Sequence, residues 1–245
     1  MDLEASAGTI VSIIGPNGSG KTTFFNCISG LYRPTAGRVL LEGADMVGLR
    51  PDQIVAAGIA RTFQTIRLFP EMTVVENVLV GMHTKTKEGW LGAALRTATF
   101  NAEEKRAAER AIELLGFFGE NLLPRQHDLA RNLSYANQRR LEIVRAMATG
   151  AAVLLLDEPA AGMNPKETSE LMADIVRLKE LGRTVLLIEH DMVVIATISD
   201  HVIALDHGCK IAEGSFDEVR HNPQVLEAYL GRGAAGTAGD SVVRA

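Results

Sequence analysis

A run of nine residues near the amino terminus has the residue types and the spacing that hold a phosphate chain. It matches the pattern G-x-x-x-x-G-K-[ST] and consists of Gly15, Pro16, Asn17, Gly18, Ser19, Gly20, Lys21, Thr22 and Thr23. The glycines let consecutive backbone N–H groups face the phosphates, and a helix that begins there adds the positive end of its dipole. Lys21 would reach the β- and γ-phosphates, and the Thr22 hydroxyl would be a ligand of Mg²⁺. The pattern predicts binding of a nucleotide with Mg²⁺.

A glycine-rich turn could match this pattern by accident. About one chain in a hundred of this length would do so at average glycine content. Here the match lies between an apolar, strand-like run at residues 9–14 and a helix-compatible stretch at residues 22–29, which is the context that a phosphate loop requires. We therefore favour nucleotide binding over an accidental turn.

A second candidate for chemistry is the pair of acids that ends the apolar run at residues 151–156. Asp157 and Glu158 follow this run directly, and a buried strand that ends in this way delivers carboxylates to the edge of the sheet where ligands bind. Asp157 is placed to hold Mg²⁺, directly or through water, and Glu158 to act as general base on an attacking water. Acids that merely decorate a helix N-terminus are the alternative, which the phosphate loop makes the weaker one.

Another apolar run, residues 184–188, ends in Glu189, His190 and Asp191. His190 could donate a hydrogen bond to the γ-phosphate in the transition state, although most histidines have no such role. For the remaining histidines we expect surface or turn positions: His83, His127, His201, His207 and His221. Only its place after a strand distinguishes His190 from them.

The elements that must position these residues are strands and helices in alternation. The β-branched runs at 9–14, 153–156 and 184–188 indicate buried strands of a mostly parallel sheet, apolar on both faces. The stretch 166–181 has helical period, and its start carries Asn164 as a cap, Pro165 in the first turn and Glu167 to complete a capping box. A hairpin is expected from 202–205 through the turn 206–208 into 209–212.

Residues 65–148 differ from their surroundings, because they hold few strand-like runs, a Lys/Thr/Gly-containing stretch at 84–92 and a charged helix from 102 to about 118. We expect a mainly helical subdomain here, inserted in an α/β core formed by residues 1–64 and 149–230. The Gly/Ala-rich tail 231–245 is predicted to be disordered and flexible.

Composition narrows the possible partners. The chain of 245 residues carries 25 basic and 30 acidic side chains, a net charge of −5, so it lacks the basic footprint of a nucleic-acid binder. Its two cysteines indicate a reducing compartment or no dependence on oxidation. The start lacks a signal-peptide pattern, and no apolar run approaches the ~20 residues needed to span a bilayer. If the protein functions at a membrane, another chain must therefore hold it there.

Together these motifs resemble the ATP-binding subunits of ABC transporters, a family of P-loop NTPases, over nearly the whole chain. Gln64, after the strand-like residues 58–63, matches the glutamine that touches Mg²⁺ and the attacking water and senses the membrane subunits. Residues 160–165 match the loop beyond the second carboxylate, and His190 matches the switch histidine. The resemblance implies catalytic roles for Lys21, Gln64, Glu158 and His190, and Thr22, Gln64 and Asp157 as metal ligands.

Residues 133–138, Leu-Ser-Tyr-Ala-Asn-Gln, lie where the family has its signature, usually Leu-Ser-Gly-Gly-Gln, at the start of a helix. The family pairs two subunits head to tail, so that the signature of one closes on the γ-phosphate held by the other. The resemblance thus implies that Ser134, Tyr135 and Ala136 bind nucleotide in a second ATP-binding subunit, identical or different.

Within the family the chain most resembles an ATPase of branched-chain amino-acid importers. The likeness lies in residues 61–69, the insertion 83–118, residues 138–143 and 157–168, and the end at 219–231. ATPases of urea importers and of lipopolysaccharide export share parts of it. The implied partners are integral-membrane permease subunits and, indirectly, a substrate-binding protein, with no nucleic acid. The implied location is peripheral, on the cytoplasmic face of the inner (plasma) membrane.

Two departures from the family pattern bear on activity. Residues 1–14 contain no aromatic side chain to stack on adenine, so either the native start lies upstream or a contact of about 1–3 kcal/mol is lost. At Ala136, a Cβ either crowds the approach of a backbone N–H to the γ-phosphate or is tolerated at a helix start. These departures leave open a nucleotide-binding assembly module with weak hydrolysis. An ABC ATPase of DNA repair or translation fits less well, given the acidic balance, the single nucleotide domain and the lack of a coiled-coil stretch.

Overall fold

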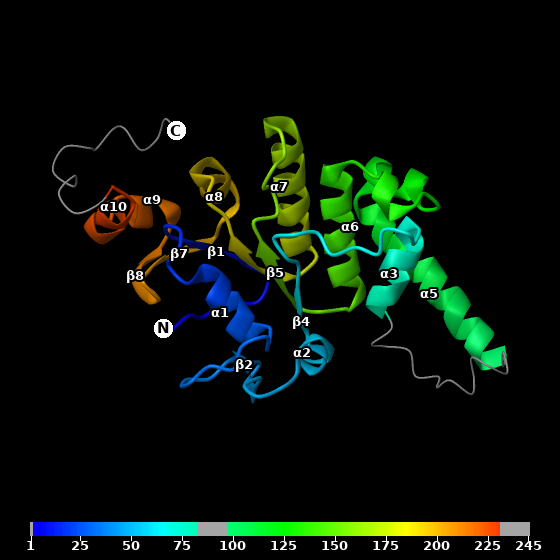
Figure 1. Cartoon of the computed structure of the whole chain (residues 1–245), viewed down its shortest axis with the longest axis horizontal. Helices are drawn as coiled ribbons and strands as arrows, with labels where there is room; N and C mark the ends of the chain where they lie inside the picture. The colour runs from blue at the N-terminus through cyan, green and yellow to red at the C-terminus, as the bar shows by residue number, and fades with distance from the viewer. Residues whose placement is uncertain (1, 83–97, 231–245) are drawn as a thin grey trace.

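A six-stranded sheet runs through the centre of the computed structural model, which describes residues 2–82 and 98–230 (Figure 1). Its strand order is β4-β5-β6-β1-β7-β8, and a two-stranded sheet of β2 and β3 lies apart from it. All neighbours in the large sheet are parallel except β7 and β8, which form an antiparallel hairpin. The strands are β1 (Ile10–Ile14), β2 (Leu40–Leu41), β3 (Ala44–Asp45), β4 (Ile59–Arg61), β5 (Val153–Asp157), β6 (Thr184–Ile188), β7 (His201–Asp206) and β8 (Cys209–Gly214).

Helices cover both faces of the sheet. In Figure 1, α1 and α2 lie below it and α7 and α8 above it, while α3, α5 and α6 gather at one end and α9 and α10 at the other. The helices are α1 (Lys21–Ile28), α2 (Pro51–Ala57), α3 (Val74–Met82), α5 (Ala98–Phe117), α6 (Tyr135–Ala148), α7 (Pro165–Glu180), α8 (Met192–Ile198), α9 (Phe216–Arg220) and α10 (Pro223–Leu230). Among these described helices, none has both the length and the apolar character that crossing a membrane requires.

Side chains of each central strand alternate between two cores. In β5, Leu154 and Leu156 pack into the core shared with α7 and α8, whereas Leu155 packs into the core shared with α1 and α2. The same alternation holds in β6, where Leu187 and Leu186 take opposite faces. Because successive side chains of a strand point to opposite faces, a sheet covered on both sides needs uninterrupted apolar runs. The prediction of buried strands that are apolar on both faces is confirmed.

The predicted element boundaries agree closely with the structure. Helix α7 starts as expected: the Asn164 side chain accepts from the Glu167 N–H (3.0 Å), and the Glu167 carboxylate accepts from the Asn164 N–H (3.1 Å). The hairpin of β7 and β8 turns where it was predicted, and α5 begins four residues earlier than the expected residue 102. The stretch 84–92, the tail 231–245 and His83 lie outside the described residues.

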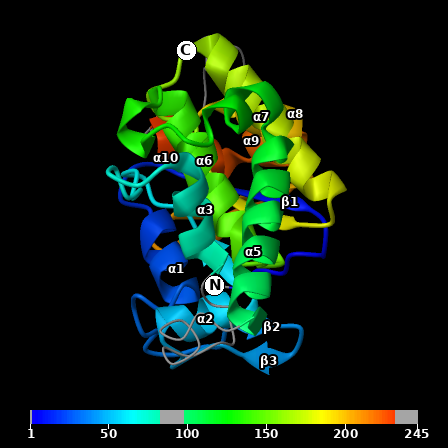
Figure 2. The same ribbon diagram turned by 90° about the vertical axis from the view of Figure 1, so that its right-hand side faces the viewer.

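The described segments between residues 65 and 148 contain α3, α5, α6 and three short 3-10 turns, as the expected helical character requires. Helices α3, α5 and α6 pack side by side through a continuous apolar core (Figure 2). Val78, Leu115 and Leu141 are fully buried in this core. The division into a core at 1–64 and 149–230 and a signature subdomain at 65–148 stays a prediction.

Helix α3 approaches α6 closely at Gly81. A Cβ built on Gly81 would lie 2.4 Å from the backbone oxygen of Arg145 and 3.1 Å from the Cβ of Ala148, both on α6. We predict that Gly81→Ala lowers the free energy of unfolding by about 1–3 kcal/mol, because the two helices must move apart. Urea denaturation at 25 °C measures it.

Gly116 on α5 is the matched control. A Cβ there meets open space, so Gly116→Ala should raise stability by about 0.5–1 kcal/mol through helix propensity alone. Similar effects of the two substitutions would show that the α3–α6 contact has slack that the structure does not reveal.

Candidate active site

The phosphate loop, residues 15–20, lies between β1 and α1 and is folded around Lys21. The Lys21 Nζ donates to the backbone oxygens of Gly15 (2.7 Å) and Pro16 (3.0 Å). Gly15 has φ +149°, and a Cβ on it would lie 2.2 Å from the backbone oxygen of Leu205. The N–H of Gly208, in the β7–β8 turn, donates to the Ser19 oxygen (2.9 Å). The loop is therefore packed against the β7–β8 hairpin at a point where only glycine fits.

The start of α1 supplies the donors for an anion. The first N–H groups of a helix, here those of Lys21, Thr22 and Thr23, have no intrahelical partner and lie at the positive end of the dipole. Burial lowers the pKa of Lys21, while the nearby Glu158 and Asp157 act in the opposite direction. A half-buried ammonium beside free N–H groups attracts a polyanion. The start of α1 therefore suits the phosphate chain of a nucleoside triphosphate.

Asp157 ends β5 as a buried carboxylate and is 3% exposed. It forms an ion pair with Arg61, the last residue of β4, whose Nη2 lies 2.8 Å from the Asp157 Oδ2. The other terminal nitrogen of Arg61 donates to the side chain of Asn26 on α1 (2.6 Å). Arg61 thus joins the second carboxylate motif to the helix of the phosphate loop. Sequence reasoning gave it no role, although a charge within a strand-like stretch was the available signal.

Glu158 takes a backbone conformation that is unusual for a residue with a side chain, with φ +47°. Its N–H donates to the Ile188 oxygen at the end of β6 (2.9 Å). Its carboxylate accepts a hydrogen bond from the Gln64 Nε2 (3.0 Å). Residues held in sparsely populated conformations cost of order 1 kcal/mol or more and cluster at functional sites. The structure thus brings together the expected base and the expected water-sensing glutamine.

A cavity of about 400 Å³ lies beside this pair. It is lined by Thr22, Asn26, Leu31, Tyr32, Arg61, Phe63, Gln64, Thr65, Arg67 and Asp157. The three residues expected to hold Mg²⁺ all line it, and they offer a hydroxyl, an amide oxygen and a carboxylate, the oxygen donors that Mg²⁺ prefers. In the described part of the chain, no cluster of three or more His, Cys, Asp or Glu side chains is arranged to hold a metal. The donor set therefore fits a metal that takes most of its ligands from phosphates and water.

The remaining predicted site residues are His190 and three residues of the signature. The His190 side chain is 68% exposed, and its Nδ1 lies 3.8 Å from the Glu189 carboxylate. Ser134 caps α6 by accepting from the Asn137 N–H (3.3 Å), Tyr135 is exposed, and Ala136 is buried. Among the described residues, none of the hydrogen bonds of Ser134 or Tyr135 reaches the phosphate loop. Their action on nucleotide held by a second subunit stays a prediction. The histidines expected at surfaces or turns are exposed at 127, 207 and 221, and His201 is half-buried at the start of β7.

Glu189 is a buried acid that the sequence pattern left without a role. It is 2% exposed and accepts from the N–H groups of Ala160 (3.0 Å) and His190 (3.2 Å). Burial raises its pKa, and the charge of Glu158 acts in the same direction, while the two backbone hydrogen bonds oppose them. Glu189 thereby fixes the loop that follows Glu158 to the end of β6.

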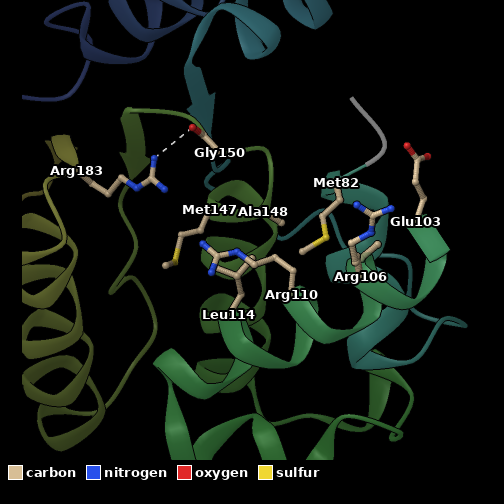
Figure 3. Close-up of a pocket in the computed structure, with 10 residues that line it drawn as sticks. Met82, Glu103, Arg106, Arg110, Leu114, Met147, Ala148, Gly150 and Arg183 are labelled. Carbon is tan, nitrogen blue, oxygen red and sulfur yellow. Dashed lines mark hydrogen bonds between the residues drawn. The ribbon is translucent and has the colours of Figure 1, made fainter. Parts of the chain in front are cut away.

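A second hollow, of about 350 Å³, lies among α3, α5, α6 and the chain before β5 and β6 (Figure 3). Arg106, Arg110 and Arg183 line it together with Met82, Met147 and Leu114. None of the predicted site residues borders it. Three of them, Thr22, Gln64 and Asp157, line the other cavity instead.

Comparison with known families agrees with this geometry. The model of the ABC transporter family matches residues 1–161. The chain belongs to the ABC transporter family. As a member it is an ATP-binding subunit with ATPase activity. A second model, described as branched-chain amino acid ATP-binding cassette transporter, matches residues 209–235.

Relatives share most of the length of this ABC protein. The high-affinity branched-chain amino acid transport ATP-binding protein LivG of Escherichia coli (strain K12) is 47% identical over 232 residues, 94% of this chain and 90% of LivG. BraF of Pseudomonas aeruginosa, which carries the same description, is 46% identical over the same coverage. A probable LivG of Archaeoglobus fulgidus is 36% identical over 94% of this chain and 88% of its own.

Solved structures show the same fold. A nucleotide-free ATP-binding cassette from an ABC transporter matches with a TM-score of 0.80 and 33% identity, covering 94% of this chain and 90% of that one. A dimeric cassette in a post-hydrolysis state, bound to ADP and phosphate, matches with a TM-score of 0.72 and 28% identity, covering 87% of this chain and 88% of that one. The expected fold, an ABC-type α/β core with helices inserted, is confirmed.

The raised pKa of Glu189 generates a prediction about pH. At a pH between the pKa of Glu189 in the unfolded chain and its raised pKa in the folded protein, the folded protein binds more protons at this group. The free energy of unfolding therefore decreases as the pH rises through that window. Glu189→Gln removes the titration. We expect the stability of Glu189→Gln relative to wild type to increase from pH 4 to pH 8, measured by urea denaturation at each pH. A difference that stays constant or decreases would contradict the assignment.

Proposed function

We propose that this chain is the ATP-hydrolysing subunit of an ABC importer for branched-chain amino acids. Its identity of 47% with LivG over 94% of the chain carries the proposal, and the family match at residues 209–235 supports it. Such a subunit does not touch the transported solute. The choice of solute therefore rests on likeness, whereas the ATPase chemistry rests on the site.

The site residues suit phosphoryl transfer to water. Water attacks the γ-phosphorus, the bond from that phosphorus to the bridging oxygen of ADP breaks, and the Glu158 carboxylate accepts the proton of the water. Gln64, 3.0 Å from Glu158, orients the carboxylate and the water. Lys21 and the N–H groups at the start of α1 stabilise the charge on the transferred group. Thr22, Gln64 and Asp157 would hold Mg²⁺, which when bound neutralises charge on the β- and γ-phosphates.

A second subunit would complete each site. In this proposal two copies, or this chain and a similar one, pair head to tail, so that Ser134, Tyr135 and Ala136 of one face the γ-phosphate of the other. His190 is exposed enough to donate a hydrogen bond to a γ-phosphate once the pair closes. The dimeric relative bound to ADP and phosphate supports this arrangement. Closure and reopening of the pair would drive conformational changes in permease subunits. The pair would be bound peripherally at the cytoplasmic face of the membrane. A substrate-binding protein would act on the opposite side of the membrane.

Size-exclusion chromatography of Glu158→Gln tests this site. The substitution removes the general base, so turnover should decrease by about 10²–10⁴-fold, while binding of ATP is retained. We expect the variant to elute as a dimer with MgATP and as a monomer without it.

Glu158→Gln/Lys21→Ala is the control and should stay monomeric, because the phosphate loop has lost its ammonium group. A nucleotide-dependent dimer combined with negligible turnover by wild type would instead indicate an assembly module. No dimer and no turnover would overturn the proposal.

The docking surface for the permease is proposed around Gln64 and residues 68–78. Phe69 and Met72 are 45% and 38% exposed there. The backbone of Phe69 is held at both its N–H and its oxygen by the buried side chain of Asn77 (2.9 and 3.0 Å). An exposed apolar side chain on a backbone that is already fixed is suited to a partner helix, since less entropy is lost on binding.

We predict that Phe69→Asp abolishes co-purification with branched-chain amino-acid permease subunits, because a charge would be buried at the contact. The control is Leu181→Asp, at a residue that is 61% exposed after α7 and should leave association unchanged. Loss of association in both variants, or in neither, would place the permease elsewhere.

A further inference from the structure

A buried ion pair on α6 lies beside the catalytic glutamine. Arg139 and Glu142 are 0% and 2% exposed, and the Arg139 Nη1 lies 2.9 Å from the Glu142 Oε2. Replacing a buried ion pair by apolar side chains of similar volume is often neutral or stabilising, because desolvation offsets the attraction of the charges. The Arg139 Nε has no hydrogen-bond partner among the described residues. Stability alone thus gives little reason for this pair.

The pair holds the backbone of the segment that carries Gln64. Arg139 donates from Nη1 to the Phe63 oxygen (2.6 Å) and from Nη2 to the Gln64 oxygen (2.7 Å). The second oxygen of the Glu142 carboxylate accepts from the Arg67 N–H (3.2 Å). Three main-chain groups within residues 63–67 are therefore fixed by two side chains of one helix.

The same guanidinium reaches the signature motif. Its Nη2 donates to the hydroxyl of Tyr135 (3.1 Å), whose ring lies 5.7 Å from the Arg139 Cζ. On the other side, the Gln64 side chain donates to Glu158. The Arg139 side chain thus makes two contacts. One is with Tyr135 in the first turn of its own helix, and the other is with the peptide that directs Gln64 towards the proposed base.

We propose that Arg139, with Glu142, is a positioning residue for hydrolysis: it holds residues 63–67 so that the Gln64 amide meets Glu158. This inference rests on the proposed ATPase function of the same site. Arginine is required because its planar fork donates in two fixed directions to neighbouring carbonyls, whereas lysine offers a single ammonium group on a flexible stem. The residue acts through Gln64 and does not touch the nucleotide.

The first test compares Arg139→Lys and the double variant Arg139→Met/Glu142→Leu with wild type. The double variant removes both buried charges, so it keeps the test valid if a single substitution unfolds the protein. We expect both to lower kcat by roughly 10- to 100-fold, as misplacement of a catalytic group does, with the KM for ATP within about two-fold of wild type. Wild-type kcat in the double variant at wild-type stability would overturn the inference.

Arg183→Met is the matched control. Arg183 also donates to two consecutive backbone oxygens, those of Gly150 (3.2 Å) and Ala151, but it lies by the hollow (Figure 3), directly before β6, whereas the phosphate loop follows the end of β1. Its replacement should change the urea midpoint without changing kcat. An equal loss of kcat in Arg183→Met would show that any backbone clamp of this kind matters, and would overturn a specific role for Arg139.

A double-mutant cycle separates positioning of Gln64 from other effects. In a Gln64→Ala background, Arg139→Lys should lower kcat by less than about two-fold, because its target is gone. Additive losses would place the action of Arg139 elsewhere. These outcomes are read against wild-type turnover, so absence of turnover in wild type itself would contradict the proposed function and not the role of Arg139.

Discussion

The register of the parallel strands decides which polar side chains can meet at the site. Asp157 pairs with Ile188, and Ile14 pairs with Ala204, so that β5, β6, β1 and β7 end at one edge of the sheet. The phosphate loop, Glu158 and Glu189 each follow one of these ends, and Asp157 is the last residue of β5. A slip by one residue would turn every side chain of a strand to the opposite core, and Asp157 would leave the cavity that it shares with Thr22. The apolar packing on both faces therefore also places the catalytic groups.

The helical part of the chain shares an apolar core with the sheet. Buried side chains of α3, α5 and α6 belong to the same cluster as those of β5, β6 and α7, while Arg139 and Glu142 extend to residues 63–67 through polar contacts. The site is thus assembled from strand ends and from a segment outside the sheet. The strand ends are fixed by strand pairing, and residues 63–67 are fixed by hydrogen bonds from two buried side chains of α6.

Sequence reasoning could find the groups whose chemistry is local. The phosphate loop, the acids at 157 and 158 and the capping box at Asn164 are each written within a few neighbouring residues. Arg61 and Asp157 are 96 positions apart, and Arg139 is 75 from Gln64, so no local pattern links them. Glu189 was visible beside His190, but only the structure shows that the acid is buried and the histidine exposed. Burial and partners of a side chain depend on distant segments, which one sequence without a fold does not reveal.

Arg61 also offsets the charge of Asp157 at the end of β5. With its guanidinium 2.8 Å from the Asp157 carboxylate and both side chains at most 5% exposed, the pair is close to neutral and attracts a free divalent ion only weakly. A cation that retains water and prefers phosphate oxygens would gain most of its ligands from the triphosphate. Metal and nucleotide should then enter together. An enzyme of this design responds to free magnesium mainly through the concentration of the magnesium–nucleotide complex.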